Sequence, residues 1–191
     1  MKRLRIIPMF VIVSCVLLTQ NLGAQMHASQ ATPKSKQAKI QNAMSAAPKA
    51  IAKDATILDY PVKEGDQPPV LRQGTNDWTC FPDDPNSPGN DPMCLDKMGM
   101  VWFEALMMKT EPKLTAPGLS YMLQGGSDAS NADPFATQPP AGAHWVTSSP
   151  HLMIISTVKL DPTMFSSDPR SGGPWIMWGG TPYEHLMVPV K

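Results

Sequence analysis

The chain has 191 residues, and its 16 Lys and Arg residues balance its 16 Asp and Glu residues, so the formal net charge is zero. The length fits a single domain and excludes a large multidomain enzyme. The charges are segregated, since residues 1–24 carry +3, residues 25–53 carry +5 and residues 54–191 carry −8. Nucleic-acid binding needs clustered Lys and Arg, so the acidic last segment argues against a nucleic-acid partner.

Residues 1–24 have the layout of a secretory signal peptide. Three basic residues precede an apolar run over residues 6–18, and Gly23-Ala24 offers small residues for cleavage. We therefore predict export to the periplasm or the extracellular space, with cleavage after Ala24. The run has 13 residues, fewer than the about 20 that span a bilayer as a helix, so no transmembrane span is expected in the mature chain.

Residues 12–15, with Cys15 at their end, also resemble a bacterial lipobox, which would make Cys15 a lipid-anchored N-terminus. The apolar run continues beyond this cysteine, whereas a lipoprotein normally turns polar there. We therefore prefer a cleaved signal peptide to a lipid anchor.

Two cysteines, Cys80 and Cys94, follow the predicted cleavage site. An even pair in an exported chain is typical of a disulfide, and closing this loop would contribute about 3 kcal/mol. Metal-binding thiolates usually show a C-x-x-C spacing or a nearby histidine, which this pair lacks. The sequence therefore predicts a Cys80–Cys94 disulfide.

Residues 25–53 are rich in Ala, Gln, Ser and Lys and contain no aromatic residue. Such a segment buries too little apolar area to offset the entropy of ordering it, so a flexible linker is expected, with some helix around residues 45–53. Its lysines could touch anionic lipid or cell wall, but a solvated linker is the simpler interpretation. The globular domain is then residues 54–191.

The domain is expected to begin with a strand over residues 56–62 and a second over residues 70–72, before a turn. Residues 80–94 are dense in Pro, Asp and Asn and predict a loop. A helix is expected next, with Asp91 as N-cap, Pro92 in its first turn and an end near Lys109.

Short apolar segments bounded by Gly, Pro, Asp or Ser then predict strands at residues 119–123, 145–147, 152–158, 175–178 and 186–190. Two segments echo each other, His151-Leu152-Met153 and His185-Leu186-Met187, either as neighbouring strands of one sheet or by coincidence. The expected fold class is α+β, with one main helix packed on a mainly antiparallel sheet and with extensive Pro/Gly/Asp-rich loops.

The residue patterns favour a protein without enzymatic activity. Ser127 follows a predicted strand like half of a nucleophile elbow, but Ala129 stands where that motif needs glycine. No free mature cysteine remains if the disulfide forms. Aspartates of the loops could in principle bind calcium, although turn chemistry already accounts for them.

Three histidines of the domain, His144, His151 and His185, could meet if the strands of the last two pair, and would then suit zinc or copper. Otherwise each is a polar residue at the end of a strand. Methionine is abundant, with 14 in the chain, which suggests copper handling, but most lie at predicted apolar positions and are better explained as core.

The most suggestive surface candidate is the segment from residue 172 to residue 185. In a strand its two tryptophans face opposite ways, so one would lie in a groove unless both faces of the sheet are covered. The candidate ligand-binding residues are Trp175, Trp178, Tyr183, Glu184 and His185.

The stretch from about residue 50 to residue 191, with the motifs WTCFPD, NDPMCLDKMGMVW and SGGPWIMWGGTPYEHLMVPV, resembles an uncharacterised family of exported bacterial proteins. The resemblance implies a bacterial, exported setting and carries no activity. The leading hypothesis is a non-enzymatic domain that binds a small ligand or an envelope partner. The alternatives are a metal-dependent protein or hydrolase using zinc or copper, and a purely structural module.

Overall fold

The computed structural model describes residues 35–63 and 65–190 of the chain. The predicted signal peptide, Cys15 and the first part of the predicted linker lie outside these residues. Among the helices of the described part, none is long and apolar enough to cross a membrane.

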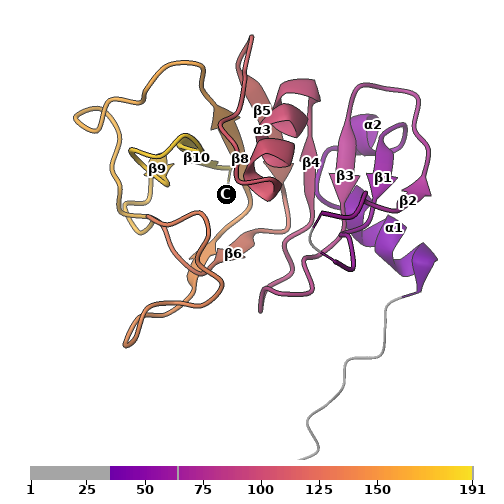
Figure 1. Cartoon of the computed structure of the whole chain (residues 1–191), viewed down its shortest axis with the longest axis horizontal. Coiled ribbons are helices and arrows are strands. Elements are labelled where there is room, and N and C mark those ends of the chain that lie inside the picture. The colour runs from indigo at the N-terminus through magenta and orange to yellow at the C-terminus, as the bar shows by residue number, and fades with distance from the viewer. Residues whose placement is uncertain (1–34, 64, 191) are drawn as a thin grey trace, which may run out of the picture. The chain divides into compact units, whose positions relative to one another are not determined.

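The described elements form an α+β fold, as predicted, with helices on a mainly antiparallel sheet (Figure 1). Strands of the large sheet follow the order β2-β1-β3-β4-β5-β8-β10-β9, and all neighbours are antiparallel except β1 and β3. A separate hairpin pairs β6 with β7. The elements are α1 (Lys36–Met44), α2 (Lys49–Ala52), β1 (Thr56–Leu58), β2 (Val70–Arg72), β3 (Thr79–Phe81), β4 (Met93–Leu95), α3 (Lys97–Met107), β5 (Gly118–Met122), β6 (Gly126–Asp128), β7 (Val146–Ser148), β8 (His151–Ile155), β9 (Trp175–Met177) and β10 (His185–Pro189).

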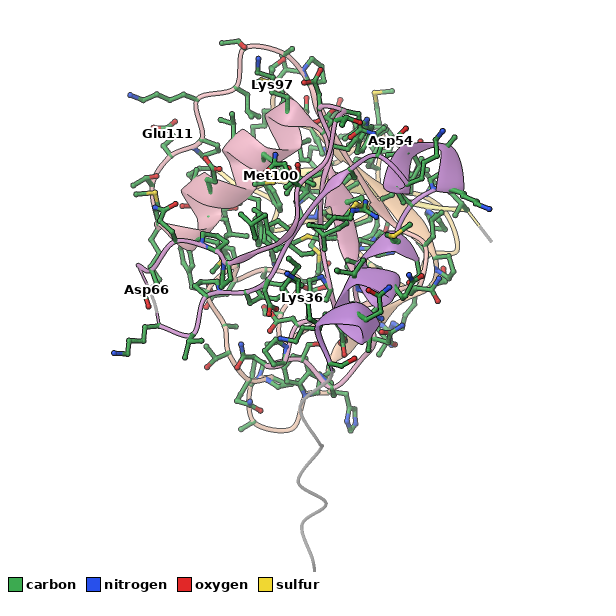
Figure 2. All side chains as sticks on the ribbon, turned by 90° about the vertical axis from the view of Figure 1, so that its right-hand side faces the viewer. Lys36, Asp54, Asp66, Lys97, Met100 and Glu111 are labelled. Atoms are coloured by element: carbon green, nitrogen blue, oxygen red, sulfur yellow. A yellow bond between two sulfur atoms is a disulfide. The ribbon has the colours of Figure 1, made fainter. Side chains whose placement is uncertain are left out.

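The two faces of the large sheet carry two separate apolar clusters. Because side chains alternate along a strand, Phe81 of β3 joins the cluster under α3, while its neighbour Cys80 joins the cluster under α1. Figure 2 shows the two groups of helices on either side of the strands. Helix α3 approaches β5 closely, since a Cβ on Gly118 would lie 2.7 Å from the backbone nitrogen of Gly99.

The predicted linker is wrong for residues 36–53, which form α1 and α2 and pack on the sheet. Ser35 caps α1 by accepting a hydrogen bond from the Ala38 amide. Ile40 and Ala43 are buried, and alanines allow the helix backbone to approach the strands closely. The composition was misleading because close approach of small residues buries area that a count of large aliphatic residues misses.

The predicted start of the main helix is also wrong. Asp96 is the N-cap, accepting a 2.7 Å hydrogen bond from the Gly99 amide, and residues 93–95 form β4. Cys94 lies opposite Cys80 in the register of β3 and β4, and the predicted disulfide between them is confirmed. Pairing of β4 on both sides outweighs the local capping signal of Asp91. The helix gives way to a left-handed residue at Lys109, close to the expected end.

The echoed segments are neighbouring strands. In the pairing of β8 with β10, Met153 lies opposite Met187 and His151 lies opposite Pro189. Residues opposite each other share a face, so both histidines and both methionines lie on the face that packs under α3.

Candidate functional site

Four of the five predicted ligand-binding residues lie in the core. Their side chains are nearly inaccessible, at 2% for Trp175, 8% for Trp178, 4% for Tyr183 and 0% for His185. The expected groove lined by an exposed tryptophan is therefore absent from this segment. Trp175 and Trp178 belong to the same buried cluster, because the strand ends before Trp178.

Trp178 is not part of a strand, because the backbone turns at this residue with φ of 53°. Its indole stacks on Trp102 of α3, with ring centroids 5.9 Å apart, and donates a hydrogen bond to the Ser130 carbonyl. The left-handed turn carries the ring back over the core, where period-2 alternation would have placed it on the opposite face.

Glu184, the fifth residue, lines a surface groove beside that turn. Its carboxylate accepts hydrogen bonds of 2.7 Å from the backbone amides of Leu160 and Gly180. These bonds connect the loop after β8 to the glycine pair after Trp178, so Glu184 shapes the groove between two segments that are distant in sequence.

The groove consists of two adjoining hollows of about 450 and 250 Å³ that share Lys159, Gly180 and Glu184. The smaller hollow has an apolar floor that includes Ile176, Leu160 and Pro162. The larger one is polar, and hydroxyl groups of Ser156, Thr157 and Thr181 line it together with the carboxylate of Glu111. An apolar end and a polar end therefore meet at Lys159.

Lys159 is exposed and makes no ion pair with any residue that the structure describes. Its ammonium group is thus available to an anionic ligand. Sequence reasoning missed Lys159 because a single lysine in a loop carries no pattern. The adjacent Gly179-Gly180 pair, which permits close backbone approach, was the available signal.

The three histidines do not form one site. His144 is exposed, whereas His151 and His185 are fully buried. In an antiparallel pair the starts of the two strands lie at opposite ends, so His185 pairs with Met177 of β9 while His151 pairs with Met122 of β5. Within residues 35–63 and 65–190, no group of three or more His, Cys, Asp and Glu side chains could hold a metal ion.

Both buried imidazoles use Nδ1 in the same way, toward the carbonyl oxygen two residues earlier. The distance is 2.7 Å from His151 to Ser149 and 2.9 Å from His185 to Tyr183. Burial lowers the pKa of His151 and lowers the pKa of His185 to about 4. Both rings are therefore neutral at physiological pH.

Ser127, considered above as half of a nucleophile elbow, lies in β6 and its hydroxyl donates to the buried carboxylate of Asp91 at 3.1 Å. Asp91 also accepts hydrogen bonds from the Asp84 amide and the Ser87 hydroxyl. This arrangement links the loop between β3 and β4 to the β6–β7 hairpin, so Ser127 is engaged in a structural contact.

Comparison of the chain with protein-family models, with curated proteins and with solved structures finds no match.

Proposed function

We propose that this protein is an exported binding domain that holds a small amphipathic ligand in the groove beside Glu184. The disulfide and the absence of a membrane-crossing helix among the described residues are compatible with export. The groove itself carries the proposal, because it joins an apolar hollow to a polar one at Lys159, which forms no ion pair with a described residue.

The chemistry of the lining indicates the class of ligand. Ile176, Leu160 and Pro162 would cover an apolar part of the ligand, and the Lys159 ammonium would attract a carboxylate or phosphate. Thr157 offers a hydroxyl group to the head of the ligand, whereas the Thr181 hydroxyl is already bonded to the Trp178 carbonyl and the Tyr183 amide. Envelope-derived amphiphiles and acylated fragments have this combination of groups.

We favour binding over catalysis because the candidate nucleophiles and the carboxylate of the groove take part in structural contacts. Among the residues that the structure describes, no Ser, Thr or Cys side chain is hydrogen-bonded to a histidine ring. The two described cysteines, Cys80 and Cys94, form the disulfide, and the Glu184 carboxylate is held by two backbone amides. The groove therefore offers recognition groups without an activated nucleophile.

The proposal is tested by calorimetric titration with decanoate and with N-acetylmuramyl dipeptide as probes. We expect at least one probe to bind the wild type and Lys159→Met to bind it about tenfold more weakly, because the charge is lost while the stem is kept. Lys97→Met, which changes an exposed lysine at the start of α3 (Figure 2), should bind as the wild type does. The proposal would be contradicted if neither probe gave a heat of binding to the wild type, or if all three proteins bound the probe with equal affinity.

A further inference from the structure

The core face of β5, β8 and β10 carries three methionines and one buried histidine at neighbouring positions of the strand register. Met122 of β5 lies directly opposite His151 of β8, and Met153 lies two residues further along β8 on the same face. Met187 of β10 lies opposite Met153. His151, Met153 and Met187 are buried, and Met122 is partly exposed.

His151 has the hydrogen-bonding pattern of a metal ligand. The Ser149 carbonyl can only accept, so the 2.7 Å contact places the imidazole proton on Nδ1 and leaves a lone pair on Nε2. Nε2 is buried and has no hydrogen-bond partner. Histidines that bind metals commonly donate the other ring N–H to a backbone carbonyl, which fixes the ring and its tautomer.

The side chains of Met122 and His151 both approach Gly126 of β6. The position that a Cβ on Gly126 would take is 3.4 Å from Cε1 of His151, 3.2 Å from Cε of Met122 and 4.0 Å from its Sδ. Both side chains therefore converge under the same glycine of β6. Since Met122 is partly exposed, this edge also offers a path from solvent to the buried ring.

The donor set selects the metal. Thioethers and a neutral imidazole are soft or intermediate ligands that suit Cu(I), whereas calcium and magnesium require oxygen ligands and zinc sites use thiolate, imidazole or carboxylate. The described cysteines are joined in the disulfide, so methionines are the free sulfur ligands of this face.

His185 provides an internal contrast. It makes the same Nδ1 contact to a carbonyl, but its ring lies edge-on between the indoles of Trp102 and Trp178, with centroids 5.1 Å from each. The two indoles pack closer to this imidazole than Trp175 packs to His151, at a centroid distance of 6.5 Å, although Nε2 of His185 also has no hydrogen-bond partner. The same local motif, His-Leu-Met, is thus placed in two different environments by its two strands.

We propose that His151 Nε2 and the sulfurs of Met122 and Met153, with Met187 adjacent, form a Cu(I)-binding site. This inference is independent of the surface groove. The competing explanation is an ordered water, which could also serve the unpartnered Ser120 hydroxyl and Trp175 indole N–H.

The test is anaerobic titration of the purified protein with Cu(I) against the chelator bathocuproine disulfonate. We expect one Cu(I) per chain in the wild type, and at least about a 100-fold loss of affinity in Met122→Leu/Met153→Leu, because both thioethers are removed. Met177→Leu is the matched control, since Met177 is buried in the same cluster but lies on β9 opposite His185, and this variant should leave the affinity unchanged. Leu and Met have similar volumes, so circular dichroism should show all variants folded.

If the double variant does not fold, the single variant Met122→Leu provides the test. Met122 is partly exposed, so this replacement should not prevent folding. Loss of its sulfur should weaken Cu(I) binding about tenfold. X-ray absorption at the copper edge should show both nitrogen and sulfur neighbours in the wild type. Failure of the folded wild type to retain Cu(I) against the chelator, wild-type affinity in Met122→Leu, or a spectrum without sulfur would overturn the site.

Discussion

Asp128 of β6 combines partial burial with an unfavourable electrostatic environment. It accepts no hydrogen bond from a residue of the described ranges, while the nearby Asp91 accepts three. Desolvation, and then the neighbouring charges of Asp91 and Asp84, raise the pKa of Asp128 from 3.8 to about 7. The folded protein therefore binds a proton between these pH values that the unfolded chain has released.

Replacing this carboxyl group should change how stability depends on pH. A raised folded-state pKa means that stability falls as pH rises from about 4 to about 7, because only the folded state still holds the proton. Asp128→Asn should remove this slope and stabilise the protein by about 1–2 kcal/mol at pH 8, less than the full shift because the side chain keeps some solvent contact. Urea unfolding at pH 5, 6, 7 and 8 measures the effect.

The control for this prediction is Asp66→Asn, which changes an exposed aspartate far from such burial. It should leave the slope of stability against pH as in the wild type. An Asp128→Asn protein with the wild-type slope would show that Asp128 is ionised normally in the fold.

At the scale of elements, α1 depends on small residues rather than on large aliphatic ones. Ala43 and Ala46 are completely buried, the Ala46 carbonyl accepts a hydrogen bond from the Leu123 amide, and Lys39 pairs with Asp59 at 2.7 Å. The local sequence predicted a flexible linker here, because it does not indicate that a face of small residues touches the sheet. The contact distinguishes a docked helix from a linker.

Two matched substitutions within α1 test this docking. Ala43→Leu should destabilise the protein by about 1–3 kcal/mol, because the larger side chain has no room at a fully buried position. Ala38→Leu changes an exposed position of the same helix and should alter stability by less than about 0.5 kcal/mol. Thermal unfolding of both variants compares them, and equal stabilities would indicate that α1 is not held against the sheet in solution.

At the scale of the whole molecule, the disulfide joins β3 and β4, two neighbouring inner strands of the eight-stranded sheet. Cys80 and Cys94 are fully buried and separated by 14 positions in sequence, with the loop between them carrying the hydrogen-bonded Asp91. The bond restricts the unfolded chain between two inner strands, each of which has further strands of the sheet beyond it.

Removal of the disulfide should therefore lower the stability of the whole domain. Cys80→Ala/Cys94→Ala is expected to lower the free energy of unfolding by about 3 kcal/mol, since the closed loop no longer restricts the unfolded state. Guanidinium unfolding should show one shifted transition with all probes, and wild type treated with reductant should follow the variant. A loss confined to the loop, with unchanged global stability, would contradict this expectation.

Local chemistry accounts for the features that were predicted correctly. Short β-branched or apolar segments between turn residues became strands β2, β5, β7, β9 and β10 within one residue of their expected bounds, whereas β8 ends three residues and β1 four residues earlier than expected. Asp91 is an exception, because its local sequence is typical of a helix N-cap. Residues 93–95 nevertheless pair as a strand with β3 and β5, so no helix begins there.

What the sequence by itself determined is the set of short-range outcomes, namely strands, turns, the disulfide and the α+β class, because these depend on neighbours along the chain. Only the tertiary structure decided that Trp178 is core, that α1 is docked and that His151 and His185 lie apart. Burial and side-chain convergence depend on residues brought together from distant segments by strand order and register. The alternation of side chains along a strand specifies which residues share a face of the sheet, but it does not specify which element covers that face.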